Sequence, residues 1–159
     1  MHRHLRAVKP LHRFFIPCED GRKPFFVVEV WRNSDEIRWA SEALTKRTER
    51  EEMEACCIGY HAYMPNGKVS PEYGTVLFHL GGLHPAVVAH EFMHATMTYC
   101  RRWRINPLHH TKRWWDGEER AATMVGHFVA QFYQRLLKVR PKVRIGARCP
   151  AIKGAPYRK

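Results

Sequence analysis

The sequence predicts an α+β fold, and three observations support this prediction. Segments rich in β-branched and aromatic residues, which are typical of strands, occur at 25–31, 55–64 and 73–80. Segments with apolar residues at helical spacing occur at 34–46, 85–101 and 118–139. The 159 residues, of which 45% are hydrophobic, suffice for one domain with its own core. The order β-α-β-β-α-α is that of an α+β domain.

Local sequence signals mark where the elements in the first half of the chain begin. Residues 1–24 are basic and contain three prolines, so we expect an arm with one short apolar contact at 14–16. The strand 25–31 follows it. Asn33 is the expected N-cap of the next helix, and Glu36 stands at capping-box distance from it.

The second half is divided by turn signals. Pro65-Asn66-Gly67 predicts a turn before the strand 73–80, and Gly81-Gly82 ends that strand. Pro85 suits the first turn of the helix 85–101. From residue 140 onward the chain is basic and carries Pro and Gly. We therefore expect an arm at 1–24, one domain at 25–139 and a tail at 140–159.

The charge is uneven along the chain. The formal net charge is +12, no acidic residue follows Glu119, and ten Lys and Arg lie from Arg120 onward. Such a tail attracts nucleic acid, an anionic surface or an acidic partner. A solvated tail that only aids solubility is an equal alternative.

Cysteine usage and hydropathy indicate the compartment. The chain has five cysteines, an odd number, and no C-x-x-C spacing, so neither a disulfide framework nor a zinc ribbon is expected. Cys56 and Cys57 point to opposite faces if they lie in a strand. We see no signal peptide and no apolar run long enough to span a membrane, and we expect a reducing cytoplasm.

The chain is organised around one motif, H-E-x-x-H, formed by His90, Glu91 and His94 within an apolar helix. Residues four apart lie on one helix face, so the two imidazoles can share a tetrahedral Zn²⁺. Glu91 lies beside them, where it can take a proton from water. Composition alone gives only about 0.06 expected matches to this motif. Two core histidines bonded to the backbone are the alternative.

A catalytic zinc needs a third protein ligand. Met97 and Cys100 occupy the positions of Gly and His in the extended H-E-x-x-H-x-x-G-x-x-H motif, so that class is excluded. The remaining candidates are His109, His110, Asp116, Glu118, Glu119 and His127. Periodicity favours Glu118, which extends the apolar stripe of the last helix. Glu119 has a structural alternative as the capping-box partner of an N-cap at Asp116.

Two stretches of the sequence resemble small phage-encoded metallopeptidase-like proteins of the gluzincin type. They are residues 88–95 and residues 119–128, the second of which has the pattern E-x-x-A followed by V-G. These proteins are distant cousins of the ImmA/IrrE peptidases, and the resemblance covers about residues 73–135. It implies a minimal zincin-like domain, in which a small mixed sheet with an edge strand packs on the motif helix. The glutamate of E-x-x-A, which is Glu119 here, is the implied third ligand, and Ala122 lets its helix approach.

The implied function is a zinc-dependent metallopeptidase with Glu91 as general base, in the host cytoplasm if the protein is phage-encoded. The strand 73–80 is the expected edge strand, onto which an extended peptide could pair. Candidates to stabilise the oxyanion are His109, His127, Tyr99 and Tyr133. The alternatives are a non-catalytic zinc-containing binding module and a nucleic-acid-associated protein recruited through its basic tail.

Overall fold

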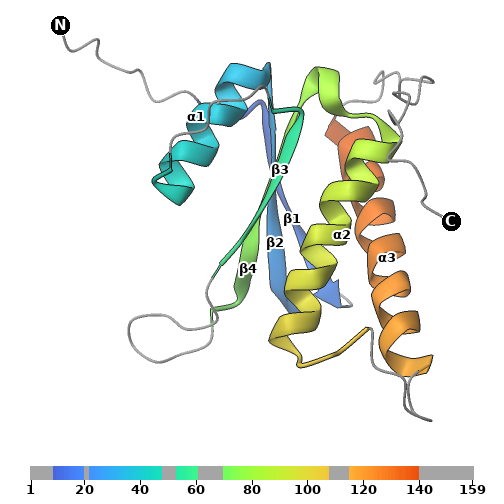
Figure 1. Cartoon of the computed structure of the whole chain (residues 1–159). Helices are drawn as coiled ribbons and strands as arrows, with labels where there is room; N and C mark the ends of the chain where they lie inside the picture. The colour runs from blue at the N-terminus through green and yellow to red at the C-terminus, as the bar shows by residue number, and fades with distance from the viewer. Residues whose placement is uncertain (1–8, 20–21, 48–52, 61–69, 108–114, 140–159) are drawn as a thin grey trace, which may run out of the picture.

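A computed structural model describes residues 9–19, 22–47, 53–60, 70–107 and 115–139 of the chain. Within them lie four strands, three α-helices and one 3-10 turn (Figure 1). In chain order these elements are β1 (His12–Glu19), β2 (Arg22–Trp31), α1 (Ser34–Thr45), β3 (Ala55–Gly59), β4 (Glu72–His79), η1 (Leu80–Gly82), α2 (Pro85–Arg102) and α3 (Trp115–Val139). The α+β class is confirmed, and no helix in the described ranges is long and apolar enough to cross a membrane.

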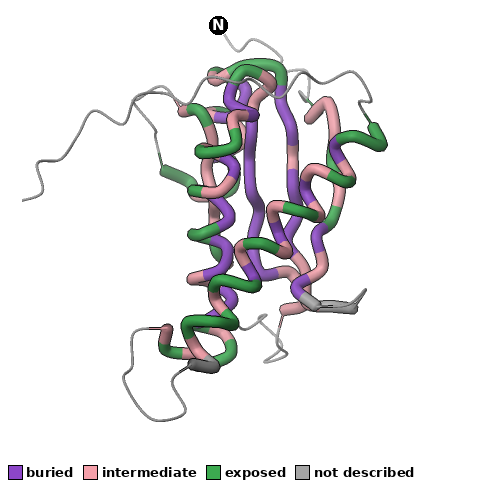
Figure 2. The backbone as a smooth tube through the Cα atoms, turned by 90° about the vertical axis from the view of Figure 1, so that its right-hand side faces the viewer, coloured by how far each residue is buried: buried purple, intermediate pink, exposed green. Residues whose placement is uncertain are grey.

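The four strands form one mixed sheet in the order β1-β2-β4-β3. β1 runs antiparallel to β2, β2 runs parallel to β4, and β3 runs antiparallel to β4. Helix α1 lies on one face of the sheet, while α2 and α3 lie on the other (Figure 1). Figure 2 shows that the buried backbone positions are concentrated in the sheet and on the helix sides that face it.

Two hydrophobic clusters hold these layers together because alternate residues of each strand point to opposite faces. The larger cluster joins the sheet to α2 and α3, with Phe78, Phe92 and Phe132 at its centre. The smaller cluster joins the sheet to α1 through Trp31, Ile37 and Leu77. The expected division of the cysteine pair is confirmed, since Cys57 packs against the larger cluster and Cys56 against the smaller one.

The N-terminus of α1 has the predicted cap. The backbone N–H of Glu36 donates to Asn33 Oδ1 at 3.0 Å. The Glu36 carboxylate in turn accepts from the backbone N–H of Arg32 at 2.9 Å. The first bond gives a partner to a backbone donor in the first turn of the helix, and the second ties Arg32, which precedes the N-cap, to the same turn. Together they fix where α1 begins.

Part of the expected N-terminal arm is a strand. His12–Glu19 form β1, in which Ile16 and Cys18 are buried in the larger cluster. Pro17 obscured this strand in the sequence, because proline disfavours strand interiors. The structure tolerates Pro17 because β1 lies at the edge of the sheet. The alternation of Phe14, Ile16 and Cys18 was the period-two signal that could have revealed it.

The expectation that the strand before the motif helix lies at the sheet edge is wrong. β4 lies between β2 and β3, and six of its eight residues are buried. The continuous apolar run Val76-Leu77-Phe78 reflects burial on both faces, which is typical of a central strand. The edge strand beside the motif helix is β3.

Helices α2 and α3 pack antiparallel against each other. The ring of Phe92, near the middle of α2, lies 5.8 Å from the ring of Phe128 in the second half of α3. The first turns of α3 lie near the end of α2, since the charge of Arg120 on α3 lowers the pKa of the Cys100 thiol on α2, against the rise that burial causes. α3 begins at Trp115 rather than at Glu118, so Asp116 lies inside the helix and is not its N-cap.

Candidate metal centre

The two histidines of the motif form a close pair on the solvent side of α2. The buried side chains of α2 include Val88, Phe92 and Tyr99, so the opposite side of the helix carries His90 and His94 in solvent. Their Nε2 atoms lie 3.1 Å apart, and their ring centroids are separated by 4.8 Å. Met93, on the same side of α2, is also 49% exposed.

The separation of the two Nε2 atoms suits a shared metal ion. Two nitrogens on a tetrahedral Zn²⁺, at ordinary Zn–N lengths, lie about 3.3 Å apart. The Nε2 atoms of His90 and His94 are close to that spacing. The same spacing also permits one ring to donate a hydrogen bond to the other, depending on tautomer. The pair therefore fits two positions of a zinc site.

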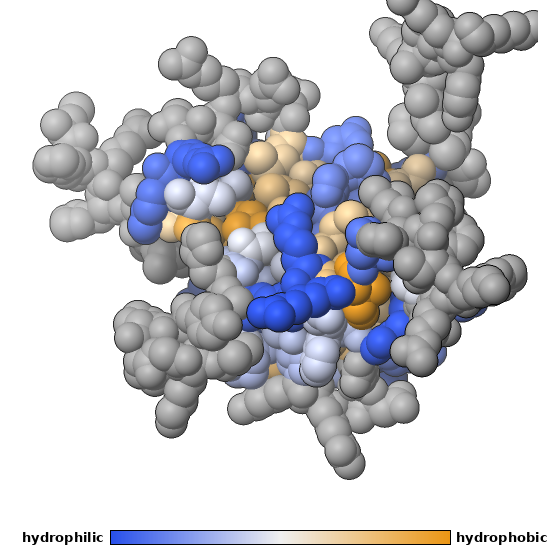
Figure 3. Space-filling view, turned by 60° about the horizontal axis from the view of Figure 1, so that its bottom comes forward, coloured by the Kyte–Doolittle hydropathy of each residue, from blue (hydrophilic) through white to orange (hydrophobic). Residues whose placement is uncertain are grey.

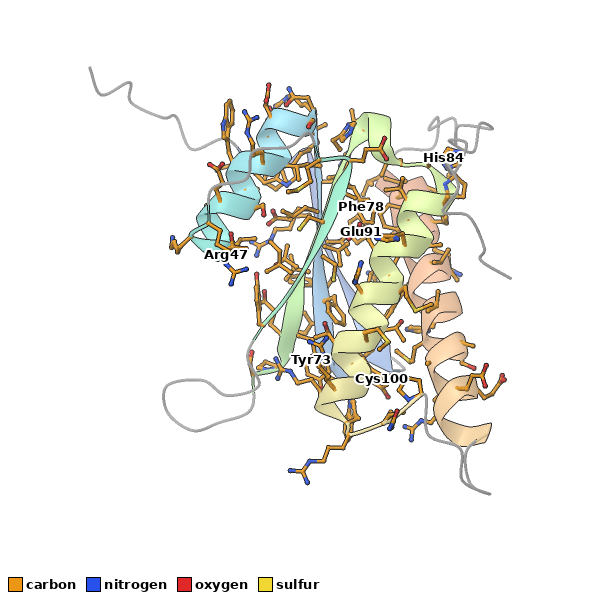
Figure 4. All side chains as sticks on the ribbon, viewed as in Figure 1. Arg47, Tyr73, Phe78, His84, Glu91 and Cys100 are labelled. Atoms are coloured by element: carbon orange, nitrogen blue, oxygen red, sulfur yellow. The ribbon has the colours of Figure 1, made fainter. Side chains whose placement is uncertain are left out.

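Glu91 is the buried member of the motif. It is 7% exposed and lies on the side of α2 that faces β3 (Figure 4). Burial raises the pKa of its carboxyl, while His90, His94 and the backbone N–H of Cys57 oppose that rise. A carboxylate with a raised pKa is a stronger base, so it is better suited to accept a proton from water.

Cys57 is a neighbour of the site that the sequence did not indicate. Its backbone N–H, on edge strand β3, donates to the Glu91 carboxylate. Burial raises the pKa of the Cys57 thiol, and the Glu91 and Cys56 charges raise it further. No side-chain pattern could have revealed this contact, because the contributing group is a backbone amide.

The structure does not bring Glu119 to the histidine pair. Glu118 and Glu119 are both exposed on the first turns of α3, next to the end of α2. Phe128, which is level with Phe92, lies nine residues further along α3, or about 13 Å of helix. Among the described residues, no three His, Cys, Asp or Glu side chains are grouped to hold a metal ion. Glu119 stays a prediction from the resemblance.

The other residues expected near the site have different positions. His127 Nε2 bonds to the carbonyl of Pro17 at 2.9 Å and so joins α3 to β1. Tyr99 is buried in the core. The Tyr133 hydroxyl is buried with no hydrogen-bond partner in the described part of the chain, and burial raises its pKa. His109, His110 and the basic tail at 140–159 lie outside the described residues.

No family model matches this chain, and searches of curated proteins and of solved structures find no significant match to it. The likeness to the phage-encoded gluzincin type stays a hypothesis based on the two sequence stretches that suggested it.

Proposed function

We propose that the protein is a zinc-dependent metallopeptidase whose site is centred on His90, Glu91 and His94. The observation that carries this proposal is the 3.1 Å separation of the two Nε2 atoms beside a buried carboxyl with a raised pKa. The zincin-like architecture is part of the same proposal. A mixed sheet with an edge strand beside the motif helix and a further helix packed against it is compatible with that architecture.

Each residue of the motif has a role that follows from its position. His90 and His94 would hold the metal ion. When bound, zinc supplies a Lewis acid that makes water more acidic and polarises a carbonyl. Glu91 accepts a proton from the attacking water and later passes it to the leaving amine. The Cys57 N–H keeps the Glu91 carboxylate oriented during this exchange.

An extended peptide is the substrate class that this surface favours. β3 ends the sheet on the side of α2, and no other strand within the described residues pairs with its outer edge. Main-chain pairing with such an edge binds a peptide with little dependence on its sequence. In this proposal the peptide pairs with β3, because the strand 73–80 is central in the sheet.

The test of the proposed function is the variant Glu91→Gln, assayed on an unstructured protein such as reduced casein. We expect zinc binding to be retained, because the two histidines are unchanged. Hydrolysis should fall by about 10² to 10⁴-fold, the usual contribution of a positioned general base. Zinc content by elemental analysis and cleavage by mass spectrometry are the two readouts.

Glu42→Gln is the matched control, since Glu42 lies on α1 across the sheet from the motif helix. It should leave hydrolysis unchanged. If wild type and Glu91→Gln cleave at the same rate, the catalytic role of Glu91 is refuted. A protein that binds zinc, unfolds on chelation and never cleaves would be the non-catalytic module.

A further inference from the structure

A cavity of about 320 Å³ opens where α2 ends. Figure 3 looks toward this end of the molecule, where strongly hydrophilic and hydrophobic surfaces lie side by side. The cavity has an apolar wall and two arginines. The wall is formed by Met97, Cys100, Ile105 and Pro107, and the arginines are Arg101 and Arg104.

The arginines at this end of α2 differ in what they contact. Arg102 is structural, because its guanidinium lies 4.5 Å from the centre of the Tyr73 ring and donates to the Tyr60 carbonyl at 2.9 Å. Arg101 and Arg104 are exposed, and in the described part of the chain neither forms a salt bridge. Two positive charges are thus available beside an apolar wall.

Arg104 occupies a backbone position that favours a different residue. Its φ is 53°, in the left-handed region that glycine or asparagine normally takes after a helix. A β-carbon is disfavoured there, so glycine would suit the backbone better. Replacing Arg104 with glycine therefore removes the guanidinium without straining the fold.

The cavity lies on the same side of α2 as the motif histidines. His90, His94, Met97 and Arg101 are spaced four, three and four residues apart, so they follow one side of α2. His94 and Arg101 are separated by seven residues, or about 10 Å along the helix. An extended peptide covers that distance with about three residues.

We propose that this cavity is a subsite for an acidic side chain of the peptide, flanked by an apolar one, about three residues from the bond that is cleaved. Arg101 and Arg104 would pair with the carboxylate, while Met97 and Ile105 would contact the apolar neighbour. The location relative to a cleaved bond rests on the proposed function. The preference for acidic peptides does not depend on the proposed function.

The test is a titration of the ¹⁵N-labelled full chain in EDTA with two blocked hexapeptides, Ala-Leu-Glu-Leu-Ala-Ala and its Gln counterpart. We expect the Glu peptide to bind about tenfold more tightly, since charge-assisted hydrogen bonds are lost with Gln. Amide shifts should concentrate between residues 97 and 107. Arg101→Gln and Arg104→Gly should each reduce the Glu preference to less than twofold.

Lys138→Gln is the matched control, because it removes one exposed positive charge at the far end of α3. It should leave the tenfold preference intact. The subsite would be overturned if the two peptides bound with equal affinity or if the amide shifts lay elsewhere. It would also be overturned if Lys138→Gln lost as much of the Glu preference as the two arginine variants. The last result would show that only the net charge of the chain attracts the peptide.

The two proposals fail separately. A Glu preference that depends on Arg101 and Arg104, in a protein that hydrolyses nothing with zinc, supports an acidic-peptide site and rejects the peptidase. Hydrolysis that depends on Glu91, without any preference for acidic peptides, supports the peptidase and rejects the subsite.

Discussion

His79 connects the end of β4 to the turn that precedes α2. Its Nδ1 accepts a hydrogen bond from the backbone N–H of Gly81 at 3.0 Å, which requires that this nitrogen carry no proton. Burial lowers the pKa of His79 from its ordinary 6.5, although the Glu54 charge opposes this shift. Both the hydrogen bond and the pKa favour the neutral ring in the folded protein.

This residue predicts a pH dependence of stability. Because the folded pKa lies below the unfolded value, the unfolded chain takes up a proton first as the pH falls below about 6.5. The unfolding free energy should therefore decrease from pH 7.5 to pH 5.5. His79 should contribute at most about 0.5 kcal/mol, the low end for one hydrogen bond, because this bond is exposed. Urea denaturation at the two pH values should show a smaller decrease in His79→Asn, whose amide oxygen can accept the same bond without titrating. An identical decrease in both proteins would contradict the assignment.

For single residues, spacing along the sequence determined which contacts could be predicted. The pairing of His90 with His94, and the cap of Glu36 on Asn33, depend only on residues three or four apart in one helix. The contact of Glu91 with the Cys57 amide joins residues 34 positions apart, and a backbone group leaves no mark in the sequence. A third metal ligand from the last helix would require two helices to be placed against each other, which spacing does not define.

Helix α3 contains two glycines in very different surroundings. A β-carbon at Gly117 would lie 2.9 Å from the carbonyl oxygen of Asn106, in the loop that follows α2. A β-carbon at Gly126 would meet nothing within 4 Å. The start of α3 thus packs directly on the loop that bounds the cavity, whereas Gly126 lies on the open side of the helix.

These two glycines form a matched pair of alanine substitutions. Gly126→Ala should raise the unfolding free energy by about 0.5 to 1 kcal/mol, because alanine favours the helix. Gly117→Ala should lower it by about 1 to 3 kcal/mol, because the new methyl group forces the loop and helix apart. Thermal or urea unfolding of both variants measures the difference. Two variants that are equally stabilised would show that α3 does not contact this loop.

The helices and strands with strong periodicity were predicted well, but which of them lie side by side was not. α1, β2, β4 and α2 lie within a few residues of their expected bounds. β1 was missed because Pro17 interrupts its pattern, and β4 was assigned to the sheet edge although it is central. Which strands pair is decided by contacts across the sheet, such as Val28 with Phe14 and Val76, and these are not local in sequence.

At the scale of the whole molecule, the apolar clusters and the proposed site lie on different surfaces. The clusters on the two faces of the sheet are apolar, while the line from His90 to Arg101 runs along the solvent side of α2. The fold class followed from the order of the elements, and the motif followed from its spacing. The layer arrangement and the absence of Glu119 from the histidine pair, by contrast, appeared only in the structure.

The measurement that tests the account most directly is zinc stoichiometry. Wild type, Glu118→Ala, Glu119→Ala and His94→Ala would be stripped of metal, reloaded with zinc and analysed for bound metal. We predict one equivalent in wild type and none in His94→Ala. A marked loss in Glu119→Ala but not in Glu118→Ala would support the third ligand that the resemblance implies, although the structure does not bring Glu119 to the histidine pair. Wild-type protein that binds no zinc would contradict the account and leave His90 and His94 as a hydrogen-bonded pair on a helix surface.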